Sequence, residues 1–196
     1  MKNIIFDLGG VILKDSPIIV INDVPSDMYN QLKVFFDDWT DLDLGNMILL
    51  DKFNECNFSF DIQEKYKDRL VNYYLYRALN VELLDKMKVL RNNGYKVYVL
   101  SDNNIDASRY YKENFKDVDG WVMSCDYHTK KRDGKLFDIL LDKFNLKGEE
   151  CYFIDDRKAN IDEALKHNIK GFVFSDNESL YEDMKNNGID IGDNYE

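Results

Sequence analysis

The chain has 196 residues, of which 44% are hydrophobic and 14% aromatic, and its formal net charge is −11. This length and composition supply a core for one domain with a small insertion, and they argue against a disordered chain. The negative charge gives no general attraction to nucleic acid, and it also repels phosphorylated small molecules. A phosphate site in this chain would therefore need a metal ion or a few well-placed cations.

Five short apolar runs predict the strands of the fold, and each is followed or closed by glycine, serine or aspartate. They cover residues 3–8, 96–100, 120–124, 151–154 and 171–174. Continuous apolar runs of this length are typical of parallel strands buried on both faces. Apolar residues at helical spacing predict helices over residues 81–90, 135–144, 160–167 and 180–187. The alternation predicts an α/β fold with a doubly wound, Rossmann-like parallel sheet.

Residues 15–80 interrupt this alternation. They are aromatic and charged, with helix-like stretches over residues 29–36, 49–56 and 62–79 and no clear buried strand. We therefore predict a core built from residues 1–14 and 81–196, with a small helical insertion at residues 15–80.

Cysteine usage and the lack of long apolar runs bear on the compartment. Cys56, Cys125 and Cys151 are far apart and form no C-x-x-C pair, which is typical of the reducing cytoplasm rather than of a disulfide framework. No apolar run approaches the ~18 residues that cross a bilayer, and Asp7 interrupts the apolar start of the chain before a signal peptide could form. We expect a cytoplasmic protein with neither a membrane nor a nucleic-acid partner; the sequence indicates no oligomeric state.

Polar residues follow three of the predicted strands. These are Asp7, Ser101 and the pair Asp155 and Asp156. Each has an ordinary explanation as a turn residue or a helix cap. Ligands of open α/β sheets, however, bind beyond the carboxyl ends of the strands, where the three segments would meet. Clustered carboxylates repel one another unless a cation compensates them, and Mg²⁺ prefers oxygen ligands. Together the residues predict a Mg²⁺ site.

Four segments resemble, in the same order, the motifs of the haloacid dehalogenase superfamily of hydrolases. They are IIFDLGGVIL at residues 4–13, VYVLSDN at 97–103, KRDGKLF at 131–137 and YFIDDRKANI at 152–161. The first is similar to that of a phosphatase subgroup with an Asp-Leu-Gly-Gly motif. Residues 15–80 stand where the superfamily places a C1-type helical cap.

The resemblance implies a Mg²⁺-dependent hydrolase of phosphomonoesters whose partner is a small phosphorylated metabolite, of the sugar phosphate or nucleotide class. Asp7 would be the nucleophile that forms an aspartyl-phosphate. The other catalytic residues would be Ser101, as a hydrogen-bond donor to the phosphate, and Lys131, as its counter-charge, with Lys130 as the alternative.

The resemblance also implies two ligand sets. The metal ligands would be Asp7, the carbonyl of Gly9, Asp155 and Asp156. The substrate-binding residues would be Gly9, Gly10, Ser101, Asp102 and Lys131.

Gly9 departs from the pattern of most phosphatases of the superfamily, which carry there an aspartate that acts as general acid and base. Such help is worth about 10²–10⁴ in rate. We therefore expect a slow phosphatase that favours good leaving groups, and the sequence does not indicate what replaces the missing acid.

Substrate choice is expected to come from the insertion. Its candidate residues are Trp39, Asp43, Asn46, Tyr73, Tyr74 and Tyr76, although aromatic residues at helical spacing are also ordinary core.

Two other functions are compatible with parts of the pattern. A non-catalytic or regulatory relative that binds phosphate or a partner is favoured by Gly9 alone. A haloacid-type dehalogenase would use Asp7 to displace a halide without a metal, and the pair Asp155 and Asp156 argues against it. A two-component receiver domain has no place for residues 15–80.

Overall fold

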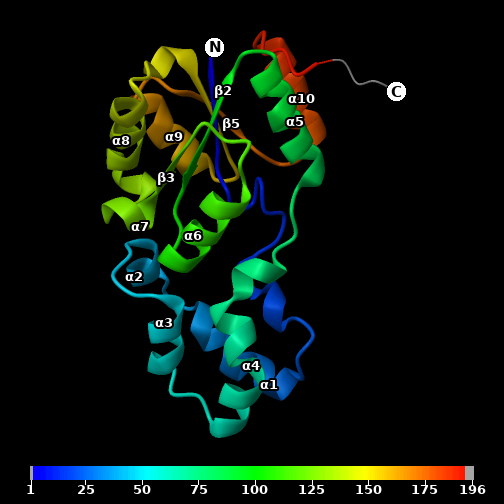
Figure 1. Cartoon of the computed structure of the whole chain (residues 1–196), viewed down its shortest axis with the longest axis vertical. Helices are drawn as coiled ribbons and strands as arrows, with labels where there is room; N and C mark the ends of the chain where they lie inside the picture. The colour runs from blue at the N-terminus through cyan, green and yellow to red at the C-terminus, as the bar shows by residue number, and fades with distance from the viewer. Residues whose placement is uncertain (1, 193–196) are drawn as a thin grey trace.

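The computed structural model describes residues 2–192 of the chain, and its centre is one five-stranded sheet (Figure 1). All neighbouring strands are parallel, in the order β3-β2-β1-β4-β5. This confirms the predicted doubly wound α/β fold. The strands are β1 (Asn3–Phe6), β2 (Lys96–Ser101), β3 (Gly120–Met123), β4 (Cys151–Asp155) and β5 (Lys170–Val173).

Helices cover both faces of the sheet, because successive side chains of a strand point to opposite sides. Ile4 and Phe6 pack in one core, and Ile5 between them packs in the other. Figure 1 shows α8 and α9 on one side of the sheet and α5 and α10 on the other. The helices are α5 (Val81–Asn92), α6 (Ile105–Asn114), α7 (Ser124–Tyr127), α8 (Lys135–Phe144), α9 (Lys158–Lys166) and α10 (Asn177–Asn186).

A layer of short helices lies beyond the carboxyl ends of the strands (Figure 1). Its buried side chains, Leu32 and Phe35 among them, belong to the same apolar core as one face of the sheet. The layer contains the 3₁₀ helices η1 (Pro17–Ile21), η2 (Val34–Phe36) and η3 (Tyr73–Tyr76), and the α-helices α1 (Ser26–Lys33), α2 (Thr40–Asp43), α3 (Leu49–Glu55) and α4 (Phe60–Val71).

Some predicted bounds are wrong. The first strand ends at Phe6 rather than residue 8, because the chain turns and the Leu13 amide donates to the Leu8 carbonyl. The helix expected over residues 62–79 ends at Val71 and is followed by a 3₁₀ turn.

Helix α6 was not predicted, because it buries Ala107, Ser108 and Tyr111, which form no strongly apolar stripe. Its N-cap is Asn104, whose side chain accepts a hydrogen bond from the Ala107 amide, so neither Ser101 nor Asp102 caps it. None of the described helices is long and apolar enough to cross a bilayer.

Candidate active site

The carboxyl edge of the sheet brings the predicted acidic residues together, because β1 lies between β2 and β4. Asp7 follows β1, and Asp155 and Asp156 stand at the end of β4. Carboxylate oxygens of these three residues all lie within 4.8 Å of one another. Asp7 and Asp155 are buried, whereas Asp156 is exposed. The edge is therefore a compact set of oxygen donors that opens to solvent at Asp156.

Lys131 enters this acidic cluster from the 3₁₀ turn η4 (Lys131–Asp133). Its Nζ lies 2.8 Å from Oδ2 of Asp7 and 2.5 Å from Oδ2 of Asp155, and its side chain is 3% exposed. Burial alone would lower the pKa of Lys131, but the charges of Asp7 and Asp155 outweigh it and raise the pKa above the ordinary value. The lysine is thus held as a buried cation.

Asp155 is surrounded by donors. Beside Lys131, its carboxylate accepts from the Arg157 amide at 2.8 Å and from Nδ2 of Asn160 at 2.9 and 3.0 Å. Burial alone would raise the pKa of Asp155, but Lys131 and these hydrogen bonds hold it below its usual value. Both carboxylate oxygens of Asp155 accept hydrogen bonds within the protein. Because these bonds hold the carboxylate in place, its ion pair with Lys131 holds the lysine in place as well.

The surroundings of Asp7 favour its charged form less than those of Asp155 do. Oδ1 accepts from the Leu8 amide at 2.7 Å, and Oδ2 faces Lys131. Burial raises the pKa of Asp7 to about 7, although the charge of Lys131 opposes the shift. A second cation at this edge would stabilise the charged form of Asp7, because opposite charges at short range favour ionisation.

The glycines after Asp7 differ in what surrounds them. Gly10 has a φ of +77°, and a Cβ there would lie 2.5 Å from Oδ2 of Asp156. A Cβ at Gly9 would meet no atom within 4 Å. Gly10 therefore lets the backbone approach Asp156 closely. The all-oxygen donor set fits Mg²⁺, which prefers carboxylate and carbonyl oxygens and keeps several waters.

Ser101 and Asp102 occupy the end of β2 and the loop after it. Ser101 is buried at the same edge as Asp7. The Asp102 carboxylate accepts from the Lys131 amide at 2.9 Å, so it holds the lysine loop. That structural task was not evident from the sequence, and the binding of substrate by Asp102 stays a prediction.

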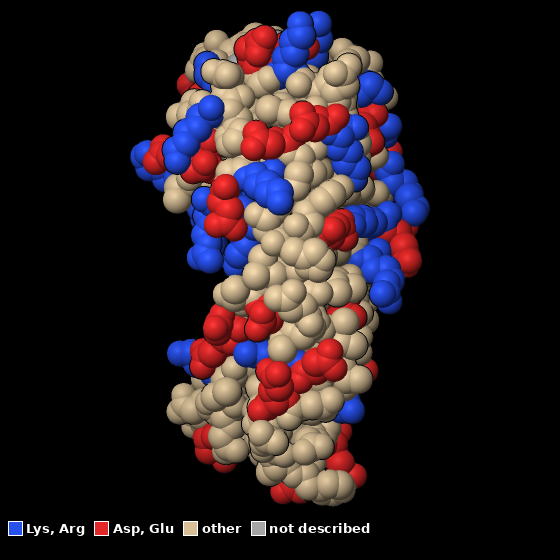
Figure 2. Space-filling view, turned by 90° about the vertical axis from the view of Figure 1, so that its left-hand side faces the viewer, with Lys and Arg blue, Asp and Glu red and all other residues tan. Residues whose placement is uncertain are grey.

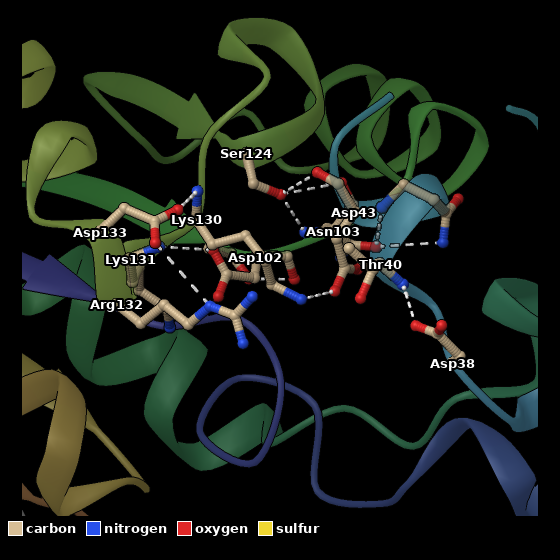
Figure 3. Close-up of polar contacts among 12 residues, drawn as sticks. Asp38, Thr40, Asp43, Asp102, Asn103, Ser124, Lys130, Lys131, Arg132 and Asp133 are labelled. Carbon is tan, nitrogen blue, oxygen red and sulfur yellow. Dashed lines mark hydrogen bonds and ion pairs between the residues drawn. The ribbon is translucent and has the colours of Figure 1, made fainter. Parts of the chain in front are cut away.

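Lys130, the alternative candidate, points elsewhere. Its Nζ donates to Oδ2 of Asp43, at the end of α2, at 2.6 Å (Figure 3). The structure thus places Lys131, and not Lys130, beside Asp7.

A cleft of about 680 Å³ opens above the acidic cluster. Among the described residues of its lining are the predicted candidates Trp39, Asp43 and Tyr73. The other three candidates lie outside the lining: two of their side chains contact other residues, and one faces solvent. Asn46 donates to Asp41, Tyr74 packs on Tyr110, and Tyr76 is 51% exposed to solvent.

The sequence missed several residues of the cleft. Phe36 stacks on Trp39, Asp15 pairs with Arg77 at 2.6 Å, and Arg157 follows the acidic pair of β4. Of these four residues, only Arg157 carried a local signal, its place in the fourth motif.

Charge in the cleft differs from the charge of the whole chain. The described lining residues include acidic and basic side chains in equal number, against a net charge of −11 for the chain. Figure 2 shows acidic and basic side chains interspersed on one face of the molecule. The cleft is therefore expected to repel an anion less than the net charge of the chain indicates.

A comparison with protein families gives a match over most of the chain. The hydrolase family described as haloacid dehalogenase-like hydrolase matches residues 1–168. A search of curated proteins gave no match.

Solved structures with the same fold include HAD family proteins and a haloacid dehalogenase. An HAD family enzyme, BT-2542 from Bacteroides thetaiotaomicron, solved with magnesium and inorganic phosphate, is 19% identical with a TM-score of 0.68, covering 92% of this chain and 99% of that one. A predicted HAD-like hydrolase from Porphyromonas gingivalis is 21% identical (TM-score 0.67; 95% and 97% covered). L-2-haloacid dehalogenase from Xanthobacter autotrophicus, with chloropropionic acid covalently bound, is 12% identical (TM-score 0.65; 96% and 84% covered). These likenesses show the fold, and the family match covers most of the sequence. The chain belongs to the haloacid dehalogenase-like hydrolase family.

Proposed function

We propose that the chain is a Mg²⁺-dependent phosphomonoester hydrolase of the C1-capped subgroup, acting on a small phosphorylated metabolite of the sugar phosphate or nucleotide class. Residues 1–14 and 81–196 would form the core, and residues 15–80 the cap. The observation that carries the proposal is the meeting of three carboxylates within 4.8 Å with the buried ammonium of Lys131. The magnesium and phosphate bound by BT-2542 support it. The three free cysteines suit the cytoplasm, which we propose as its compartment.

Magnesium would be held by Asp7, the Gly9 carbonyl, Asp155 and Asp156. When bound, Mg²⁺ offsets the negative charge of the phosphoryl group and of the carboxylates around it. Asp155 would either bind the ion or hold a water bound to it, while both of its oxygens also accept hydrogen bonds within the protein.

The chain's own residues then have distinct tasks. An oxygen of Asp7 attacks phosphorus, and the bond from phosphorus to the leaving oxygen breaks, which gives an aspartyl-phosphate. Lys131 balances the charge of Asp7 and the transferred group, and the Ser101 hydroxyl donates to a phosphate oxygen. Water then attacks phosphorus, releases inorganic phosphate and a proton, and restores the Asp7 carboxylate.

Gly9 explains the expected substrate preference. The leaving oxygen must take its proton from solvent, because residue 9 has no side chain to supply one. Anomeric and aryl phosphates, whose sugar or aryl oxygen leaves readily as an anion, depend least on general acid catalysis.

Phosphate release from sugar, nucleotide and aryl phosphates, with and without Mg²⁺, tests the proposal. We expect release that requires both Mg²⁺ and Asp7, so that Asp7→Asn is inactive while Asp85→Asn, on an exposed pair with Lys88, is active. Metal-independent halide release from a 2-haloacid would instead establish a dehalogenase. Binding of Mg²⁺ and phosphate without turnover of any substrate would establish a non-catalytic relative.

A further inference from the structure

Asp43 joins the helical layer to the core through two different atoms. Its carboxylate Oδ2 accepts from Nζ of Lys130 at 2.6 Å, and its main-chain carbonyl accepts from Oγ of Ser124 at 2.5 Å (Figure 3). The side chains of Asp43 and Lys130 are each only 16% exposed. A pair so shielded from water interacts more strongly than the exposed pairs of a protein surface.

Each partner of Asp43 belongs to, or holds, a loop of the active site. Lys130 is the neighbour of Lys131 in the chain. Oγ of Ser124 also accepts from the Asn103 amide at 2.9 Å, and thereby holds the loop that follows Ser101. The two loops are tied to each other by the hydrogen bond from the Lys131 amide to Asp102. Asp43 thus contacts both sides of one polar network (Figure 3).

Other contacts dock the same part of the helical layer without reaching these loops. The turn after Asp43 fits closely against α7, since a Cβ at Gly45 would lie 2.4 Å from the Cys125 carbonyl oxygen. Further along, the Leu49 amide donates to Oδ2 of Asp106 on α6 at 2.9 Å. Docking in general and support of the lysine loop can therefore be separated by mutation.

We propose that Asp43 is a positioning residue, which holds the Lys131 and Asn103 loops in the geometry for phosphoryl transfer while the helical layer is docked on the core. The expected effect on turnover rests on the proposed phosphatase function. The contacts of Asp43 with Lys130 and Ser124 do not depend on that function. The Asp43 side chain acts through Lys130, and its main-chain carbonyl, which substitution leaves in place, acts through Ser124; neither need touch the substrate. Loss of the Asp43–Lys130 pair would then release the lysine loop even while the helical layer stays docked, so that turnover depends on this contact and not on docking in general.

Kinetics with 4-nitrophenyl phosphate and with a sugar phosphate test the role. We expect Asp43→Ala to lower kcat about tenfold to a hundredfold, by the same factor for both substrates and with a smaller change in KM, because small misplacements are costly to catalysis. Asp43→Glu should recover part of the loss. Adding Lys130→Ala to Asp43→Ala should cost little more, because the pair is already broken.

Asp106→Asn is the matched control, because it weakens docking at Leu49 without touching the lysine loop. Its kcat should stay within about twofold of the wild-type value. Three outcomes would each overturn the proposal. The first is a loss of kcat in Asp106→Asn equal to that in Asp43→Ala, and the second is a loss of kcat confined to one substrate. The third is a double variant whose loss of kcat is the product of the losses in Asp43→Ala and Lys130→Ala.

Amide hydrogen exchange measures the positioning without any turnover. The Lys131 amide, bonded to Asp102, should exchange faster in folded Asp43→Ala than in the wild type or in Asp106→Asn. Unchanged exchange would overturn the positioning role. If the wild type releases no phosphate, the proposed function fails, while this measurement still decides the role of Asp43.

Discussion

The ammonium of Lys131 lies 2.8 Å from a carboxylate oxygen of Asp7 and is almost completely buried. The chain thus places a cation beside the group proposed to attack phosphorus, in a protein whose net charge is −11. Asp155 holds the lysine from the other side at 2.5 Å. The proposed phosphate site would therefore depend on local charge rather than on the net charge of the chain, and Mg²⁺ would add to that local charge.

Removing the lysine charge should be costly to stability as well as to activity. Lys131→Met leaves Asp7 and Asp155 buried without their cation, and we expect a loss of about 3–5 kcal/mol in the free energy of unfolding. Urea unfolding in metal-free buffer measures it. The double variant Lys131→Met and Asp155→Asn should recover part of the loss. No recovery would show that the buried charge of Asp155 does not cause the loss of stability.

Gly10 should be required for the metal site. Gly10→Ala strains a backbone with φ of +77° and brings a Cβ within 2.5 Å of Oδ2 of Asp156. We expect Mg²⁺ affinity to fall about tenfold or more in titration calorimetry, because Asp156 must move. Gly9→Ala is the control, since its Cβ meets no atom within 4 Å. Equal affinities in the two variants would contradict the assignment of Asp156.

Gly9 offers a gain-of-function test, because its side-chain direction is open. Gly9→Asp supplies a carboxyl group where most phosphatases of the family have one. Turnover of an alkyl phosphate should rise about tenfold or more, and that of 4-nitrophenyl phosphate much less, since only the poor leaving group needs a proton. Unchanged turnover of the alkyl phosphate would show that Gly9 does not limit the rate.

Asp119 should give the protein part of its stability at neutral pH. Burial alone would raise its pKa, but hydrogen bonds from the Val97 amide and Lys96 hold it below the ordinary value of 3.8. A lowered pKa means that the unfolded chain binds more protons, so this stability is present above that value and is lost as the pH falls through the folded pKa.

Thermal unfolding of Asp119→Asn measures this effect. The variant should be about 1 kcal/mol less stable at pH 7, and the difference should vanish in acid. Asp117→Asn, which breaks a more exposed pair with Arg91, should change stability less at every pH. A difference for Asp119→Asn that persists in acid would indicate lost packing rather than lost charge.

In the helical layer, sequence patterns did not predict where each helix ends. Residues 62–79 read as one helix, whereas the structure ends α4 at Val71 and adds a 3₁₀ turn over Tyr73–Tyr76. Tyrosines suit a helix face, a turn or a cleft wall, and only packing selects among them. Tyr73 lines the cleft while Tyr76 faces solvent, although both lie in one turn.

The apolar runs of the sequence are enough to predict the sheet and the edge at which its polar residues meet. Once the apolar runs are identified as parallel strands, Asp7, Ser101 and Asp155 must converge, since the carboxyl ends of parallel strands share one edge. The partners of neighbouring residues at this edge depend on how distant segments pack in the folded chain. Lys130 and Lys131 are identical in type and adjacent in the chain, and packing alone sends one to Asp43 and the other to Asp7. Those partners come from distant segments, whose approach depends on the folded core and not on any local pattern.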